Sequence, residues 1–161
     1  MNSTQQNRDF TRVGKSKIHG TGVFAKRKIP KGTRIFEYKG KRVRKDALML
    51  EVEIGRSSLM YVLNVNPTQA VDGEQGGNEA RFINHSCAPN CEVYVFDDTP
   101  YIYAMRDIIR GEELTFDYQL QSVSGKRLTP KKQREMFPCY CGDSDCRGTM
   151  VAKQQRNKRT E

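Results

Sequence analysis

The sequence has no long apolar run, and this absence argues against a membrane-spanning helix. No stretch of the 161 residues approaches the roughly 20 apolar residues that a bilayer span requires. The first ten residues, MNSTQQNRDF, contain no apolar segment, so we expect no secretory signal. Apolar residues make up 36% of the chain, and charged residues of both signs make up 29%. We therefore expect one small folded domain rather than a disordered chain.

Histidine is scarce, with two residues, and the cysteines number five. An odd cysteine count without an export signal argues against a disulfide framework and for thiols kept reduced inside a cell. The segment CYCGDSDCRG carries three cysteines in the spacing C-x-C-x4-C and has many turn-forming residues but few apolar ones. A closed tetrahedral zinc site would need one more ligand from far away in the sequence.

The fourth ligand remains open at this point. The three clustered thiols are Cys139, Cys141 and Cys146, and the candidates for the fourth position are Cys87, Cys91, His19 and His85. The alternative is a set of unrelated buried cysteines, because a free thiol behaves as a small hydrophobic group that cores accept. The turn-rich, apolar-poor surroundings of the cluster favour the metal site.

Charge is divided along the chain. The total is +9, from 28 Lys and Arg against 19 Asp and Glu. Residues 1–46 carry 14 basic and 3 acidic groups, residues 47–118 carry 4 and 12, and residues 119–161 carry 10 and 4. This pattern favours basic flanks that contact phosphate and an acidic middle that attracts a cationic partner. The alternative is a merely solvated surface.

Regular elements are expected to be short and mostly extended. Runs of β-branched and aromatic residues predict strands at 33–43, 60–65, 91–96, 101–105 and 114–118, with a hairpin turn at 97–100. Helices are expected at 45–54, where Leu48, Leu50 and Ile54 recur, and after the cap-like pair Thr129-Pro130. Residues 119–134 are polar and basic and resemble a mobile connector, and the tail at 153–161 is expected to be disordered.

Three segments could carry chemistry. The glycine pair at 19–24 would let a ligand approach the backbone, although such a pair is more often an ordinary turn. Residues 81–91, RFINHSCAPNC, crowd polar side chains together, but a hydrolase with a cysteine nucleophile would need a separate base. Residues 111–118, GEELTFDY, could orient an amine through a tyrosine hydroxyl or could be a plain amphipathic strand.

The order and content of these segments resemble one family. HGTGVFA, EYKG, GNEARFINHSCAPN, GEELTFDY and CYCGDSDCRG, over about residues 12–148, are similar to the SET-domain protein-lysine methyltransferases with a post-SET zinc motif. The resemblance implies a mainly β fold with short helices, built of small curved β-sheets with a C-terminal pseudoknot and a zinc-bound post-SET loop. It divides the chain into a flexible N-terminus at 1–11, a SET domain at 12–118, a basic connector at 119–138, a post-SET zinc motif at 139–150 and a basic tail at 151–161.

The resemblance also implies a role for each matching position. The expected contacts to S-adenosylmethionine are His19, Gly20, Thr21, Gly22, Tyr61, Asn84 and His85. The expected catalytic and channel residues are Tyr118, Tyr61, Phe116 and Tyr38. The expected structural zinc ligands are Cys87, Cys139, Cys141 and Cys146, which leaves Cys91 as the spare thiol.

The implied activity is methyl transfer from S-adenosylmethionine to the lysine amine of a basic protein tail, such as a histone or another chromosomal protein. Phe116, in place of a tyrosine, suggests capacity for di- or trimethylation. The alternatives are a catalytically silent SET fold that binds chromatin and a small zinc-dependent nucleic-acid-binding protein. We expect a monomer with non-specific DNA contact through its basic ends and no membrane contact. The expected location is a reducing intracellular compartment: chromatin or the nucleus for a eukaryotic, viral or host-directed protein, and otherwise the bacterial cytoplasm.

Overall fold

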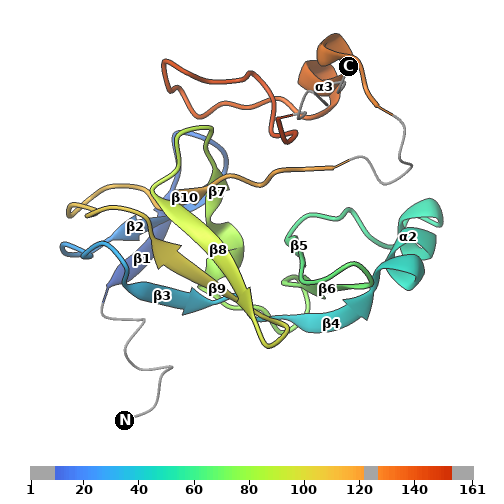
Figure 1. The fold of residues 1–161 in the computed structure, drawn as a ribbon, viewed down its shortest axis with the longest axis horizontal. Coiled ribbons are helices and arrows are strands. Elements are labelled where there is room, and N and C mark those ends of the chain that lie inside the picture. Colours follow the sequence, from blue (N-terminus) through green and yellow to red (C-terminus); the bar gives the residue numbers. More distant parts are fainter. Residues whose placement is uncertain (1–9, 122–126, 154–161) are drawn as a thin grey trace, which may run out of the picture.

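The computed structural model describes residues 10–121 and 127–153, which form four small β-sheets, two α-helices and one 3-10 helix (Figure 1). The expected mainly β fold with short helices is therefore confirmed. None of the helices in these two ranges is long and apolar enough to cross a membrane. The expected flexible N-terminus, the middle of the connector and the end of the basic tail include residues 1–9, 122–126 and 154–161, which lie outside the described residues.

The strands are two to six residues long, as the scattered β-branched and aromatic runs predict. In chain order they are β1 (Thr11–Lys15), β2 (Thr21–Ala25), β3 (Arg34–Glu37), β4 (Lys41–Arg44), β5 (Val62–Asn64), β6 (Gln69–Asp72), β7 (Asn84–His85), β8 (Cys91–Phe96), β9 (Thr99–Ala104) and β10 (Thr115–Phe116). The helices are α2 (Lys45–Glu53), the 3-10 helix η1 (Glu79–Phe82) and α3 (Pro130–Met136).

Three of the sheets are antiparallel and one is parallel. Strand β1 pairs with β2, β9 lies between β3 and β8, and β6 lies between β4 and β5, all antiparallel, whereas β7 and β10 are parallel. The predicted hairpin is confirmed as the β8–β9 connection. Its turn is shorter than expected, because Asp97 and Asp98 alone form it, with φ of 49° and 54°. Two left-handed residues match the strand twist that a two-residue hairpin requires.

The prediction of one strand at 33–43 is wrong. The chain breaks between β3 and β4, and these two strands join different sheets. Gly40 lies so close to the backbone of Asp72 that a β-carbon there would collide with the Asp72 carbonyl group. This close approach is a tertiary contact, so the break in the strand could not be predicted from the local sequence.

Both predicted helices are present. Thr129 caps α3, since its hydroxyl accepts a hydrogen bond from the Lys132 N–H at 3.3 Å, and Pro130 occupies the first turn. Helix α2 buries Leu48, but Leu50 and Ile54 are exposed. The recurring apolar residues that predicted this helix therefore do not all pack against the protein.

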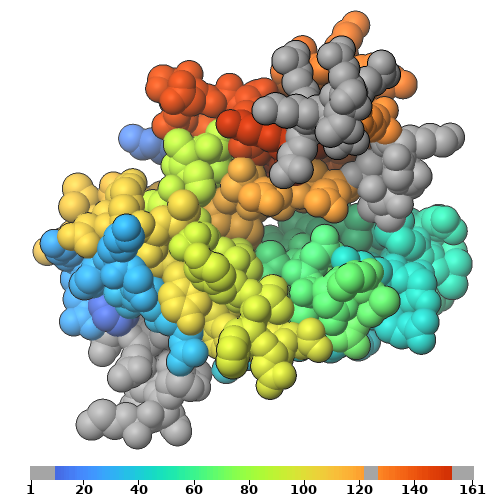
Figure 2. All heavy atoms as spheres, viewed as in Figure 1, coloured from blue at the N-terminus to red at the C-terminus, as the bar shows by residue number. Residues whose placement is uncertain are grey.

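The core lies against the β3–β9–β8 sheet and joins segments that are far apart in the sequence. Its largest fully buried side chains include Ile29, Ile35, Ile83, Ile102, Ile108 and Leu114. The segment 112–118 runs between β2 and β7: the Leu114 N–H donates to the Val23 carbonyl at 2.7 Å, and β10 pairs with β7. This double pairing agrees with the crossing expected at the pseudoknot. In Figure 2 the segment after residue 127, orange to red, lies along one side of the sheets.

Candidate active site and metal centre

Tyr118 is the last residue of the segment 112–118, two residues after the end of β10. Its hydroxyl donates to the Ile83 carbonyl at 2.6 Å, and its ring contacts those of Phe116, with centroids 4.9 Å apart, and His85, at 5.3 Å. Burial, and then the nearby Tyr61 and Glu113, raise the pKa of the Tyr118 phenol. The hydroxyl therefore stays protonated at neutral pH and keeps oxygen lone pairs available to accept a hydrogen bond.

Tyr38 and Tyr61 lie beside Tyr118. The Tyr38 hydroxyl donates to the Tyr61 carbonyl at 2.8 Å, although these residues are 23 positions apart. Burial raises the pKa of Tyr38, and the proximity of Tyr118 raises it further, so the two phenols are close enough to interact. Tyr61 has a φ of 82°, which is strained for a residue with a side chain. Backbone strain of this kind is concentrated at functional sites.

Asn84 connects the 19–22 loop to the segment 112–118 by hydrogen bonds. Its side-chain amide donates to the carbonyl groups of His19 at 3.0 Å and Thr21 at 3.1 Å, and to the Glu113 carboxylate at 2.9 Å. Gly20 has a left-handed φ of 47°, and nothing lies within 4 Å of the place where a β-carbon would be. The loop is thus held in place on one side and open on the other.

Gly22 has a different role from Gly20. A β-carbon at Gly22 would collide with the Glu113 carboxylate, so the glycine permits this acid to reach under the loop. The Glu113 carboxylate also accepts a hydrogen bond from the Ser16 hydroxyl, with 2.7 Å between the two oxygen atoms. Sequence analysis assigned no role to Ser16 or Glu113, because their contact spans 97 residues and no local pattern signals it.

His85 is buried and neutral. Its Nδ1 accepts the Tyr118 backbone N–H at 3.0 Å, and its Nε2 lies 3.5 Å from the Cys87 Sγ. Burial lowers the pKa of His85 to about 4, against the opposing effect of Asp117. The carboxylate of Asp117, 3.6 Å from Nδ1, therefore faces a neutral ring and does not form an ion pair with it. The imidazole connects the tyrosine to the cysteine cluster.

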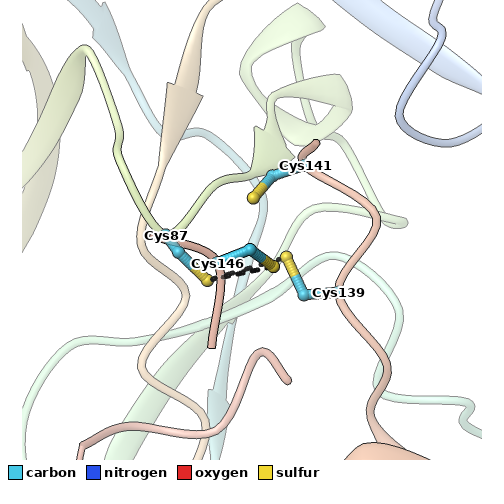
Figure 3. Close-up of side chains that lie close together, drawn as sticks. All are labelled: Cys87, Cys139, Cys141 and Cys146. Atoms are coloured by element: carbon cyan, nitrogen blue, oxygen red, sulfur yellow. Dashed lines mark hydrogen bonds between the residues drawn. The ribbon is translucent and has the colours of Figure 1, made fainter. Parts of the chain in front are cut away.

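Four cysteines from two distant segments converge (Figure 3). The sulfur atoms of Cys87, Cys139, Cys141 and Cys146 all lie within 4.8 Å of one another. The Cys87 sulfur is 3.7 Å from that of Cys139 and 4.0 Å from that of Cys146. Zinc bound tetrahedrally at about 2.3 Å separates its sulfur ligands by about 3.8 Å, so the donor set fits this metal. Cys91 is buried in β8 apart from the cluster.

Backbone N–H groups favour thiolates in part of the cluster, whereas burial raises the pKa values of Cys87 and Cys139. The backbone N–H groups of Arg147 and Gly148 donate to the sulfurs of Cys87 at 3.4 Å and Cys146 at 3.3 Å. Burial opposes ionisation of Cys141, but backbone N–H groups and neighbouring thiols outweigh it and lower the pKa of Cys141 to about 6. Metal binding requires deprotonated thiols, which these donors stabilise.

An ion pair joins the cysteine segment to the tyrosine site. Both outer nitrogens of Arg147 contact the Asp117 carboxylate, at 2.8 and 2.9 Å, and the two side chains are only 13% and 21% exposed. Asp117 precedes Tyr118 directly. Arg147 lowers the pKa of Asp117 against the opposing effect of burial. Sequence analysis did not single out this pair, since neither residue type nor spacing indicates a partner 30 residues away.

Asn90 is another residue whose part the sequence did not reveal. Its side chain donates to the Glu113 carbonyl at 2.8 Å and accepts the Thr115 N–H at 2.9 Å, so it pins the strand that leads to Tyr118. It belongs to the polar segment 81–91, whose crowding indicated that these groups needed hydrogen-bond partners.

A family model of the SET domain matches residues 20–119. The chain belongs to the SET-domain family. It is 33% identical over 157 residues to "Histone-lysine N-methyltransferase, H3 lysine-4 specific" of Chaetomium globosum, an alignment that covers 91% of this chain and 14% of that protein. The protein of the same name from Schizosaccharomyces pombe is 37% identical over 145 residues, covering 84% of this chain and 14% of the relative.

A plant relative shows a similar likeness. "Histone-lysine N-methyltransferase TRX1" of Oryza sativa subsp. japonica is 39% identical over 145 residues, which cover 85% of this chain and 13% of that protein. The chain thus spans about one seventh of the length of the curated relatives it matches. The SET-family resemblance inferred from the motifs is confirmed.

Proposed function

We propose that this SET protein transfers methyl groups from S-adenosylmethionine to the side-chain amine of lysine in a histone or another basic chromosomal protein. The observation that carries the proposal is the convergence of Tyr118, Tyr38, Tyr61 and Phe116 beside the Asn84-bound loop. The names of the relatives support a histone-type substrate.

The residues around the 19–22 loop suit S-adenosylmethionine. Backbone carbonyls and the open side of Gly20 suit its amino-acid end, and Tyr61 offers an aromatic ring to its adenosine end. The side chains of Asn84 and His85 are buried and hydrogen-bonded, so these two residues would contact the adenosine end through their backbone. Bound there, this ligand supplies a methyl group on a sulfonium for in-line displacement by an amine. The Asn84 bonds to His19 and Thr21 would hold the loop in one geometry.

The aromatic side chains would prepare the lysine. A free lysine titrates near pH 10.4, so at neutral pH its amine is almost entirely protonated. Desolvation among Tyr38, Tyr61 and Phe116 lowers the lysine pKa, and the proton leaves to water before methyl transfer. Because the Tyr118 hydroxyl already donates to Ile83, its oxygen accepts from the amine and orients the amine lone pair.

Phe116 would leave space for a methylated amine. It is 6% exposed and carries no hydroxyl to hold a water against the substrate nitrogen. We therefore infer that the enzyme proceeds beyond monomethyl-lysine.

The four cysteines would hold one structural zinc. Cys87 follows β7, so the metal would fasten the 139–150 segment to the end of the strand that carries Asn84 and His85. Phe137 and Met150, joined by a backbone hydrogen bond of 3.0 Å, are the apolar side chains that this segment would bring toward the channel. The proposal includes the division into a SET domain at 12–118 and a post-SET motif at 139–150.

The proposal extends to the setting of the reaction. We infer that the protein acts as a monomer on chromatin in a nucleus. Lys131, Lys132 and Arg134 on α3 would contact DNA phosphates, since these exposed cations lie in the basic C-terminal third.

The test is transfer of a radiolabelled methyl group to purified nucleosomes and core histones, with mass spectrometry of the product. Tyr118→Phe should lower kcat by about a hundredfold, since loss of orientation costs on that order. Ile109→Ser, at a side chain that is 62% exposed and outside the site, is the control and should leave the rate unchanged. A folded wild-type protein that methylates no protein would favour the catalytically silent chromatin binder.

A further inference from the structure

The solvent-facing side of the β3–β9–β8 sheet presents a row of aromatic side chains. Strand pairing sets Tyr94 opposite Tyr101 and Glu92 opposite Tyr103, and paired residues project to the same face. On the opposite face of these strands, Cys91, Ile102 and Ala104 are buried in the core. The outward face therefore collects Glu92, Tyr94, Phe96, Tyr101 and Tyr103.

Two of these rings are far more exposed than aromatic side chains usually are. Phe96 is 75% exposed and Tyr94 is 55% exposed. Figure 2 shows the β8–β9 hairpin, yellow-green to yellow, on the outer surface of the molecule. Contiguous exposed apolar surface of this kind marks an interaction site more often than single scattered side chains do.

The same hairpin has an unpaired edge. Strand β8 is the outermost of its sheet, and among the described residues only β9 pairs with it. The two-residue turn makes Phe96 and Thr99 the hydrogen-bonded pair, so the N–H and C=O groups of Val93 and Val95 point away from β9. Pro100 lies opposite Val95, in a pair that exchanges no hydrogen bonds between the two strands. Its missing N–H therefore costs no bond between β8 and β9.

Exposed edges are usually protected by lysine or by proline on the edge strand itself, and β8 contains neither. The charges on the hairpin itself are of one sign, although Arg34 of β3 lies on the same face of the sheet. No Lys or Arg occurs between residues 82 and 105, whereas Glu92, Asp97 and Asp98 lie on the hairpin. The pKa of Tyr94 is raised by its hydrogen bond to Glu92, which places that carboxylate against the exposed ring. Acidic groups around aromatic rings favour a cationic partner and disfavour nucleic acid.

One cation of the protein already lies on this aromatic face. The guanidinium group of Arg34 lies over the Tyr101 ring, 4.8 Å from its centroid. The Tyr94 ring packs edge-on against Tyr103 with centroids 5.6 Å apart, which holds it in place. Among residues 10–121 and 127–153, no cation lies over the exposed rings of Tyr94 and Phe96. A cation over an exposed ring is favourable by electrostatic attraction to the ring face.

We propose that this face binds an extended Lys- and Arg-rich segment of the protein substrate, at a distance from the methylated lysine. The segment adds a strand to the free edge of β8, using the Val93 and Val95 backbone groups, and its cationic side chains lie over Tyr94 and Phe96. The identification of the segment as part of a methylation substrate rests on the proposed function, but the binding itself does not.

Binding is tested by fluorescence anisotropy with a labelled (Gly-Lys-Gly-Arg)4 peptide and a (Gly-Glu)8 peptide as the charge control. Tyr94→Ser/Phe96→Ser should weaken binding of the basic peptide by roughly four- to twenty-fivefold, since each exposed ring is worth about a factor of two to five. Tyr94→Phe, which keeps the ring, should retain most of the affinity. Ile109→Ser removes an apolar side chain that is 62% exposed outside the hairpin and serves as the matched control. Circular dichroism establishes that each variant is folded.

The second measurement compares methylation of intact histone H3 with that of a nine-residue H3 peptide. The double serine variant should raise KM for the long substrate and leave both constants for the short one unchanged. Equal binding of the basic peptide by wild type and double variant would overturn the inference, whatever the catalytic result. It would also be overturned if sedimentation showed a wild-type dimer that Phe96→Ser dissociates, because the face would then be a self-interface. Basic-peptide binding that the variant abolishes, without methylation of any protein, would sustain the face and refute the proposed function.

Discussion

The ion pair between Arg147 and Asp117 should couple the cysteine segment energetically to the strand that carries Tyr118. The sensitive perturbation is Arg147→Gln, which keeps a polar side chain but removes the guanidinium group and its charge. The Asp117 carboxylate would then keep its hydrogen bond from the Gln119 N–H, of 3.1 Å. It would lose its two hydrogen bonds from Arg147, of 2.8 and 2.9 Å. A largely buried carboxylate without its cation is the costly state, more so than the absence of both partners.

The expected cost follows from the burial of the pair. Breaking a fully buried ion pair costs about 3–5 kcal/mol, and the two side chains are 13% and 21% exposed, so we expect about 3 kcal/mol. For a domain of this size that corresponds to a fall in Tm of roughly 6–12 °C. Asp117→Asn/Arg147→Gln should cost little more than either single change, which gives a coupling energy of about 2 kcal/mol.

The assay is thermal unfolding followed by circular dichroism with zinc in excess, so that metal loss does not contribute. Lys28→Gln is the control, because the Lys28–Asp107 pair is 65% and 52% exposed. Its removal should cost less than about 1 kcal/mol. The reasoning is refuted if the two single changes at the buried pair simply add, to within about 0.5 kcal/mol.

Three further changes have defined outcomes. Phe116→Tyr, which adds a hydroxyl beside Tyr118, should shift the products toward monomethyl-lysine, and mass spectrometry showing an unchanged ratio would contradict this. Metal analysis should find about one zinc per chain; removal by a chelator should lower the Tm and abolish activity, and a fully folded, metal-free protein would contradict the cysteine assignment. Ile102→Ala in the fully buried core should cost about 2–5 kcal/mol in denaturant unfolding, whereas Leu50→Ala on the exposed side of α2 should cost under about 1 kcal/mol.

Local chemistry explains which elements could be predicted. The run at 91–96 became β8, and the Thr129-Pro130 cap begins α3, because turn residues and caps act within a few positions. Strands β1, β6 and the two-residue β7 were missed, since none contains a continuous run of β-branched or aromatic residues. Strand β7 also depends on a distant partner, β10. The break at Tyr38 to Gly40 was missed for the same reason, as it is set by contact with Asp72.

In the candidate site, too, residue types could be predicted from the sequence, whereas contacts between distant residues could not. Because the motif residues themselves carry the chemistry, the sequence alone identified the SET family, the four clustered thiols and the tyrosines proposed for the channel. Only the tertiary structure decided that Tyr118 donates to Ile83, that Asn84 ties the loop to Glu113, and that Arg147 meets Asp117. It alone also decided that the aromatic residues of the β8–β9 hairpin share one exposed, acidic face. Residue type determines what a group can do, whereas its partner depends on chain crossings that bring distant residues into contact.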